Sequence, residues 1–158
     1  MVNFIRDNKI LIVDDFEQHL ELLRFLLERA GYRTIFEAVN GEQAVAVARE
    51  NCPELIIMDI NMPVMSGLEA LKILRKESAT SNIPVIAITG SALESDRDTL
   101  LKLGFDGFIP KPINIGSFIE RIEEFIPVAR HAGLAFTPDG TINFEKAQPD
   151  SYSLAPKI

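Results

Sequence analysis

Residues 10–15 read Ile-Leu-Ile-Val-Asp-Asp, an apolar run that ends in two carboxylates. Two further apolar runs also end in a charged residue: Leu55–Met58 is followed by Asp59, and Phe108–Pro110 is followed by Lys111. A short run rich in Ile, Val and Leu is typical of a strand buried on both faces, as in a parallel sheet. In open α/β sheets the active crevice lies outside the carboxyl ends of the strands. We therefore expect three carboxylates and an ammonium group to meet at one edge of one sheet.

Five apolar runs predict strands, near residues 9–13, 33–38, 54–59, 83–89 and 105–109. Between them, apolar residues recur every three or four positions, which predicts helices. The recurring residues are Leu20, Leu23, Leu26, Leu27 and Ala30, then Ala44, Val45 and Ala48, then Leu68, Leu71 and Leu74, and most clearly Ile115, Phe118, Ile119, Ile122, Phe125 and Ile126. The helix near 93–103 is the weakest prediction, because its first half offers a core almost nothing. We expect it to be marginal and mobile.

The alternation of strands and helices predicts right-handed crossovers and a doubly wound α/β fold. The second strand, Arg33–Glu37, mixes charged and apolar residues, as an edge strand does. The fifth strand is short and carries Asp106 and Gly107, which suits the opposite edge. We therefore expect a flavodoxin-like, five-stranded parallel sheet in the order 2-1-3-4-5 with five flanking helices, rather than a Rossmann order.

The composition limits the class of protein. A chain of 158 residues with 47% hydrophobic and 25% charged residues predicts one packed domain with a short appendage. The net charge of −7 disfavours a nucleic-acid partner. The sequence has no apolar run of membrane-spanning length and no signal peptide, so we expect no membrane association. The lone Cys52, which we interpret as a structural thiol, fits a reducing compartment and a cytoplasmic location.

The composition changes after about residue 127. Four prolines interrupt the remaining segment, namely Pro127, Pro138, Pro149 and Pro156. Residues 134–144 contain a Pro-Asp-Gly turn between apolar residues, which is typical of a hairpin, and a disordered tail is the alternative. We therefore expect a globular domain over residues 1–127 and a C-terminal extension over 128–158 that is partly disordered or forms a small hairpin.

The three carboxylates predicted at the sheet edge, Asp14, Asp15 and Asp59, would repel one another. Two unit charges 4 Å apart repel by about 4 kcal/mol at an effective dielectric constant of 20. Such a cluster takes up protons or binds a cation, and oxygen ligands suit Mg²⁺, with Mn²⁺ as the alternative. Lys111 adds a positive charge, and Thr89 adds a hydroxyl at the end of the fourth run. A carboxylate beside a divalent metal and a lysine can accept a phosphoryl group.

Each of these residues has an ordinary interpretation when it is taken alone. An Asp after a strand is commonly a helix cap, and a Lys before Pro is usually solvated. The specific signal is the coincidence of the residues at successive strand ends. For other residues we prefer the ordinary interpretation: Gly67 serves the loop backbone, Met58, Met62 and Met65 pack, and His19 and His131 are solvated surface residues.

In combination these motifs resemble the receiver domain of bacterial response regulators. The resemblance covers roughly residues 8–127. It rests on the acidic pair Asp14-Asp15, on residues 58–67 (Met-Asp-Ile-Asn-Met-Pro-Val-Met-Ser-Gly), on Thr89-Gly90, and on Phe108 with Lys111-Pro112. The motifs are specific because they occur together and in this order.

The resemblance implies a chemical role for the residues at the sheet edge. Asp59 would accept a phosphoryl group from the phosphohistidine of a histidine kinase or a histidine phosphotransfer protein. Mg²⁺ would be held by Asp15, by Asp59 and by the main-chain carbonyl of Asn61. Asp14 would act on the metal directly or through water. Lys111 would pair with the phosphoryl oxygens.

The resemblance also implies residues that transmit or tune the signal. Thr89 would move to hydrogen-bond the phosphoryl group, and Phe108 would turn inward to fill the vacated space. The peptide bond before Pro112 would be cis. Asn61 and Ser91 flank the acceptor site and would tune hydrolysis of the phosphoryl group.

Our hypothesis is a phosphorylation-activated switch that is not an enzyme. Phosphorylation of Asp59 would alter the face formed by residues 93–126, which would bind a downstream protein. The protein would be a monomer or a phosphorylation-dependent homodimer. No second catalytic motif and no helix-turn-helix follows residue 127, which favours a stand-alone regulator.

Four alternatives stay open at this point. The chain is a receiver excised from a longer hybrid protein, or a degenerate receiver that acts only as a scaffold. An aspartyl-phosphate hydrolase of the haloacid dehalogenase type is a third, because Asp59-Ile60-Asn61 echoes its Asp-x-Asp motif, although Asn61 stands where that class has Asp and a cap domain is missing. A flavodoxin-like cofactor binder is the fourth, although Asp14-Asp15-Phe16 occupies the place of its phosphate loop.

Overall fold

The computed structural model describes residues 5–90, 97–126, 135–136 and 142–143. The chain divides into two compact units, Met1–Phe125 and Ile126–Ile158, and each is described by itself. The first unit holds the parallel sheet and all the predicted site residues that the structure describes. Ser91 lies outside the described residues, as do residues 93–96 of the predicted fourth helix and most of the predicted hairpin.

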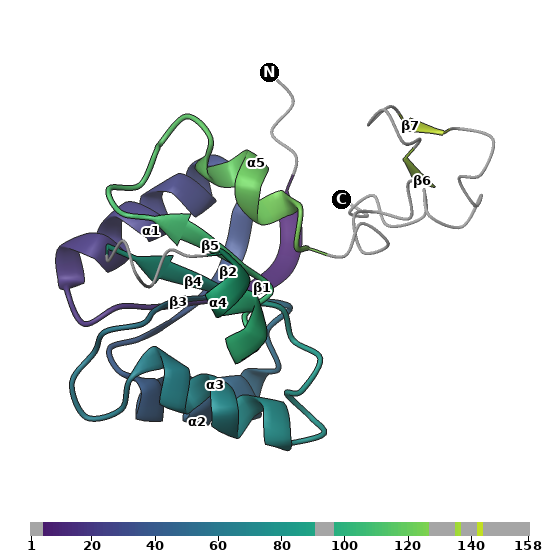
Figure 1. The fold of residues 1–158 in the computed structure, drawn as a ribbon. Coiled ribbons are helices and arrows are strands. Elements are labelled where there is room, and N and C mark those ends of the chain that lie inside the picture. Colours follow the sequence, from purple (N-terminus) through teal and green to yellow (C-terminus); the bar gives the residue numbers. More distant parts are fainter. Residues whose placement is uncertain (1–4, 91–96, 127–134, 137–141, 144–158) are drawn as a thin grey trace. The chain divides into compact units, whose positions relative to one another are not determined.

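A five-stranded parallel sheet forms the centre of the first unit, with the strands in the order β2-β1-β3-β4-β5. This confirms the predicted flavodoxin-like order (Figure 1). The strands are β1 (Arg6–Val13), β2 (Tyr32–Ala38), β3 (Leu55–Asp59), β4 (Val85–Thr89) and β5 (Gly107–Pro110). All five residues of β3 and all five of β4 are buried, as expected for central strands between two helical layers.

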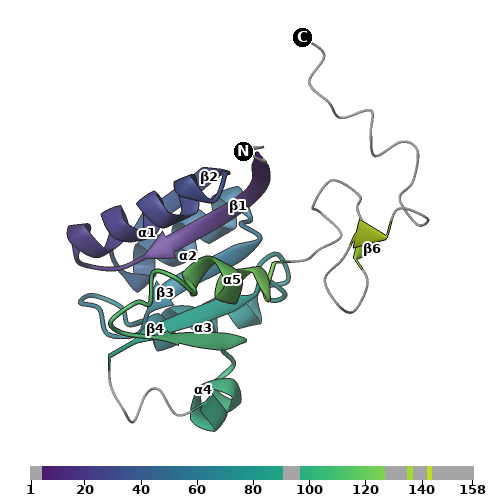
Figure 2. The same ribbon diagram turned by 90° about the horizontal axis from the view of Figure 1, so that it is seen from above.

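Five helices flank the sheet, as predicted: α1 (Glu17–Arg29), α2 (Gly41–Asn51), α3 (Gly67–Lys76), α4 (Arg97–Leu103) and α5 (Phe118–Glu123). α1 and α5 cover one face, α2 and α3 cover the other, and α4 lies beside the edge strand β5 (Figures 1 and 2). Leu20, Leu23, Leu26 and Leu27 are the buried face of α1, which confirms the predicted period.

Local sequence signals determine where several helices begin. The Asn40 side chain accepts a hydrogen bond from the main chain of Gln43 at the start of α2. Ser66 and Glu69 form a reciprocal capping box at the start of α3. At the start of α1, by contrast, Phe16 has no side-chain cap. Each of these three helices begins directly after a loop from the carboxyl end of a strand.

The structure differs from the sequence prediction at several positions. β1 begins at Arg6 rather than near residue 9, because Arg6 pairs with Tyr32 before a shift in register. Ile115, assigned to the apolar face of the last helix, precedes α5 and is 61% exposed. Leu68 is only partly buried in α3. Cys52, interpreted as a structural thiol, is exposed and ends α2 in the left-handed conformation, with φ of 47°.

The second unit contains a short antiparallel pair, β6 (Ala135–Phe136) and β7 (Ile142–Asn143). Phe136 pairs with Ile142, and Ala135 pairs with Asn143. Both strands lie within residues 134–144, where the sequence predicts a hairpin around the Pro-Asp-Gly turn.

Candidate functional site

Three carboxylates meet at the carboxyl ends of two neighbouring strands. Asp14 and Asp15 follow β1, and Asp59 ends β3, which lies next to β1 in the sheet. One oxygen from each carboxylate lies within 4.8 Å of those of the other two. Asp14 and Asp59 are 0% and 5% exposed, so water screens little of their repulsion. The sheet topology thus brings together the three acids that the sequence predicts at one edge.

Lys111 brings a positive charge to this cluster. Its Nζ lies 3.0 Å from Oδ2 of Asp59 and 3.5 Å from Oδ2 of Asp14. Its main-chain N–H donates a hydrogen bond to the carbonyl of Thr89 at the end of β4, and the Lys111–Pro112 bond is cis. The ammonium group therefore reaches two of the three acids from the far side of β4.

Burial and the ion pair with Lys111 shift the pKa of Asp59 in opposite directions. Burial raises the pKa of Asp59, and the hydrogen bond and charge of Lys111 lower it only in part, so the pKa remains above its ordinary value. Burial also lowers the pKa of Lys111, but Asp59 and Asp14 outweigh that effect and raise it. Lys111 is therefore a cation at neutral pH.

The donor set fits a divalent cation. Among the described residues, Oδ1 of Asp15 is a buried side-chain oxygen without a hydrogen-bond partner. A buried carboxylate oxygen without a donor is costly, and a metal ion would satisfy it. Oxygen ligands of this kind are those that Mg²⁺ prefers. The Asn61 main-chain N–H donates to Oδ1 of Asp59 over 3.3 Å, which brings the Asn61 backbone next to the acids.

The predicted switch residues lie on the two strands beyond β3. Thr89 ends β4 and Asp59 ends the neighbouring strand β3, so the two residues lie at the same edge of the sheet. Thr89 is 2% exposed. Phe108 is half-buried on β5 and pairs with Ala87 of β4. Phe108 also packs against the core and lines a cavity between α4 and α5. A movement of Phe108 would therefore alter the surface as well as the core.

The loop after β3 packs tightly against Asp59. Gly67 is buried at the start of α3 and donates its N–H to the carbonyl of Ile60 over 2.8 Å. A Cβ atom at Gly67 would lie 2.2 Å from the carbonyl oxygen of Asp59. Close packing, rather than an unusual backbone angle, therefore accounts for the glycine.

His19 is a residue of the site that the sequence analysis missed. We interpreted it as a solvated surface histidine, but its Nδ1 lies 3.0 Å from Oδ2 of Asp14. A signal was available, since His19 lies in the first turn of the helix that follows the acidic pair. A side chain in that turn can reach back to the strand end.

The chain belongs to the response regulator receiver domain family, whose model matches residues 10–123. Among curated relatives, it is similar to the polar-differentiation response regulator DivK of Brucella anthropi. The two are 41% identical over 117 residues, which cover 74% of this chain and 94% of that protein. DivK of Brucella ovis is 40% identical over 117 residues, which again cover 74% of this chain and 94% of that protein. The protein is thus a response regulator receiver of two-component signalling, similar to DivK.

Solved structures agree with this assignment. The chemotaxis response regulator CheY4 of Vibrio cholerae has a TM-score of 0.69 at 28% identity, over 75% of this chain and 98% of that one. A receiver domain of a Pseudomonas aeruginosa sensor histidine kinase has a TM-score of 0.69 at 28% identity, over 76% of this chain and 98% of that one. That structure contains magnesium in its active-site cleft. The Ssk1 receiver of Saccharomyces cerevisiae, in complex with the histidine phosphotransfer protein Ypd1, has a TM-score of 0.70 at 26% identity, over 80% and 94%.

Within the part of the chain that the structure describes, no helix is both long enough and apolar enough to cross a bilayer.

Proposed function

We propose that Asp59 is the phosphoacceptor of a signalling switch and takes its phosphoryl group from a histidine kinase or a histidine phosphotransfer protein. The observation that carries this proposal is the buried Asp59 carboxylate, held 3.0 Å from Lys111 beside two further acids. Asp59 attacks the phosphorus of the donor's phosphohistidine, so that the P–N bond breaks as the new P–O bond forms. Lys111, already a cation, then pairs with the phosphoryl oxygens.

Mg²⁺, or Mn²⁺ as the alternative, completes the proposed site. Asp15, Asp59 and the main-chain carbonyl of Asn61 hold the ion, and Asp14 contributes directly or through water. When bound, the ion neutralises the acids and supplies charge that stabilises the phosphoryl oxygens. The proposal is supported by the buried oxygen of Asp15 and by the magnesium in the Pseudomonas neighbour.

Signal transmission runs from Asp59 through Thr89 to Phe108. Thr89 moves to hydrogen-bond the phosphoryl group, and Phe108 turns into the space that it leaves, while Asn61 and Ser91 tune hydrolysis. To move such an equilibrium from 1:99 to 99:1 takes about 5.5 kcal/mol of differential stabilisation. A Thr89→Ala variant that accepts phosphate but no longer changes the surface around Phe108, followed by NMR, would support this route. A full surface change in the variant would rule it out.

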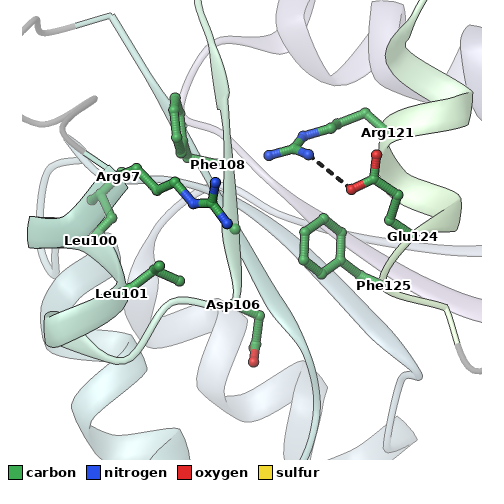
Figure 3. Close-up of a pocket in the computed structure, with 9 residues that line it drawn as sticks. Arg97, Leu100, Leu101, Asp106, Phe108, Arg121, Glu124 and Phe125 are labelled. Atoms are coloured by element: carbon green, nitrogen blue, oxygen red, sulfur yellow. Dashed lines mark hydrogen bonds and ion pairs between the residues drawn. The ribbon is translucent and has the colours of Figure 1, made fainter.

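The downstream partner binds the face of residues 93–126, of which the structure describes 97–126. α4, β5 and α5 surround a cavity of about 200 Å³ there. Figure 3 shows Arg97 of α4 and Arg121 of α5 extending into this cavity from either side, and the Arg121 guanidinium lies over the Phe125 ring. Phe108 lines the same cavity, so a change in its position changes what the cavity can bind.

The phosphodonor approaches the site over an apolar rim, formed by the loops at the carboxyl ends of the strands. Three loops that follow the strand ends carry exposed apolar side chains: Phe16 at 57%, Val64 at 77% and Ile115 at 61%. Val64 has φ of 69°, an unfavourable angle for a β-branched residue. A rim of this kind can exclude water when a protein partner presents its phosphohistidine.

The protein acts in the cytoplasm, binds neither nucleic acid nor membrane, and catalyses only its own phosphorylation and dephosphorylation. Residues 1–127 form the receiver, and residues 128–158 form an extension. The protein is a stand-alone regulator, and a receiver from a longer hybrid protein is the alternative. Light scattering of the full chain, and of a version that ends near residue 128, separates a monomer from a homodimer and tests whether the extension dimerises.

The central test is phosphorylation by a small donor. The full-length protein is incubated with acetyl phosphate and Mg²⁺, and its intact mass is recorded with Asp59→Asn as the control. The expected result is one phosphoryl adduct that is lost in the variant and prevented by EDTA. An adduct that persists in Asp59→Asn would show that another residue is the acceptor.

A further inference from the structure

His19 connects the first turn of α1 to the acid cluster. Its main-chain N–H donates to the carbonyl of Phe16 over 3.1 Å, while its side chain turns back toward the end of β1. Nδ1 lies 3.0 Å from Oδ2 of Asp14, and the two side chains are 43% and 1% exposed. The Phe16 and His19 ring centroids are 5.3 Å apart, so Phe16 packs beside the imidazole. A half-exposed ring therefore contacts a carboxylate that solvent does not reach.

The donors around the two buried acids are divided between them. Asp14 accepts the main-chain N–H of Phe16 at Oδ1 over 2.9 Å and contacts His19 at Oδ2. Lys111 lies closer to Asp59, at 3.0 Å, than to Asp14, at 3.5 Å. His19 is thus the nearer donor to Oδ2 of Asp14, and Asp59 is the nearer carboxylate to Lys111, which contacts both acids.

We propose that His19 is a positioning residue of the acid cluster, which holds the Asp14 carboxylate in orientation for a divalent cation and leaves Lys111 on Asp59. The inference rests on the metal site of the proposed function. A carboxylate without its proton can only accept, so a hydrogen bond to such a carboxylate requires the hydrogen on Nδ1. Without that donor, Oδ2 of Asp14 turns to Lys111, the next nearest donor, and away from the cation. Partners that orient metal-binding side chains change metal affinity by about 10- to 100-fold.

Two variants of similar shape separate the hydrogen bond from the bulk of the side chain. In His19→Asn the amide nitrogen occupies the place of Nδ1, and in His19→Leu a methyl group does. Titration of the full chain with MgCl₂ by calorimetry should give a dissociation constant roughly tenfold weaker for His19→Leu, with His19→Asn within about twofold of the wild type. His19→Ala serves as a second variant without a donor if His19→Leu does not fold.

The outcomes distinguish this inference from the proposed function. An unchanged or tighter constant in the donor-free variant, or an equal loss in His19→Asn, overturns the positioning role, and so does a wild type that takes up no Mg²⁺. Phosphorylation of the wild type by acetyl phosphate is measured in parallel. If the constants follow the expected pattern but Asp59 takes no phosphate, the proposed function fails and the role of His19 stands.

Discussion

The two ends of the sheet carry ionic clusters that are built in opposite ways. At the carboxyl ends, three acids lie together, Lys111 pairs with Asp59 and Asp14, and one oxygen of Asp15 lacks a donor among the described residues. At the amino ends of β4 and β5, the guanidinium of Arg75 donates to the carboxylate of Asp106 over 2.7 Å. It also donates to the carbonyl oxygens of Ser81, Ile83 and Gly104.

The difference distinguishes a cluster whose charges are matched from one with surplus negative charge. Asp106 also accepts the main-chain N–H of Val85 over 2.8 Å, so its charge has two donors. The Arg75 cluster therefore binds α3 to the two strands with its donors and acceptors matched. The acid cluster has more negative charge than its donors neutralise, which costs stability and leaves a place for a cation. Substitutions in the Arg75 cluster should therefore change mainly the free energy of unfolding, whereas loss of a ligand from the acid cluster should change mainly the Mg²⁺ affinity.

The largest loss of stability is expected from Arg75→Met. It leaves the carboxylate and the carbonyl oxygens without their donors, and should lower the free energy of unfolding by about 3 kcal/mol. Urea denaturation measures the loss in the free energy of unfolding, and the exposed Lys76→Met on the same helix is the matched control. Mg²⁺ affinity should not change. A loss no greater than that of the control would show that the cluster does not stabilise the fold.

A smaller loss is expected from Gly67→Ala. The added Cβ would lie 2.2 Å from the carbonyl oxygen of Asp59, so the backbone must shift. We expect a loss of about 2 kcal/mol together with slower phosphorylation, because the shift displaces Asp59, the proposed acceptor. The exposed Gly116→Ala is the control. Normal phosphorylation in a destabilised Gly67→Ala would mean that α3 moves and Asp59 does not.

Asp59→Asn should stabilise the protein by roughly 1 kcal/mol at neutral pH, because it removes a buried charge next to Asp14. The pKa of Asp59 is raised by burial, so the folded state prefers the protonated acid and the ionised form lowers stability. The gain should be absent below about pH 4, appear as the pH rises through the raised pKa, and be complete above it. Urea denaturation at several pH values across this range measures the gain in the free energy of unfolding, with the exposed Asp7→Asn as control. A gain that does not vary with pH would exclude ionisation as the cause.

The smallest effect on stability is expected from Asp15→Asn. Its Oδ1 has no donor to lose among the described residues, so the free energy of unfolding should change by no more than about 0.5 kcal/mol. Mg²⁺ affinity, measured by calorimetry, should fall at least about tenfold, because a charged ligand is removed. Glu17→Gln, an exposed acid in the first turn of α1, should leave both unchanged. If Asp15→Asn binds Mg²⁺ normally, Asp15 is not a metal ligand.

The sequence predicted the features of the fold that depend on local pattern. The runs at Ile10–Val13 and Leu55–Met58 are buried strands, and the polar residues that follow them meet because parallel strands end at one edge. Strand order followed from the charged second strand and the short fifth strand. Local patterns of this kind determine the acid cluster almost completely.

Local sequence patterns did not predict contacts between residues that are distant in the sequence. Arg75 and Asp106 are adjacent only after β4 and β5 have paired, and the sequence gives no sign that the two charges belong together. Ile115 matched the helical period, but α5 begins only at Phe118. For His19, the surface interpretation considered the helix alone and omitted the strand end in front of it.

Cys52 gives the protein a built-in site for chemical labelling. It is the single cysteine of the sequence, and it is exposed at the end of α2, just before β3 begins. The five residues of β3 rise about 3.3 Å each, so roughly 15 Å of strand separate this thiol from the Asp59 end. A fluorophore or nitroxide attached there would report on the phosphorylated and free protein from outside the site, with the natural sequence unchanged.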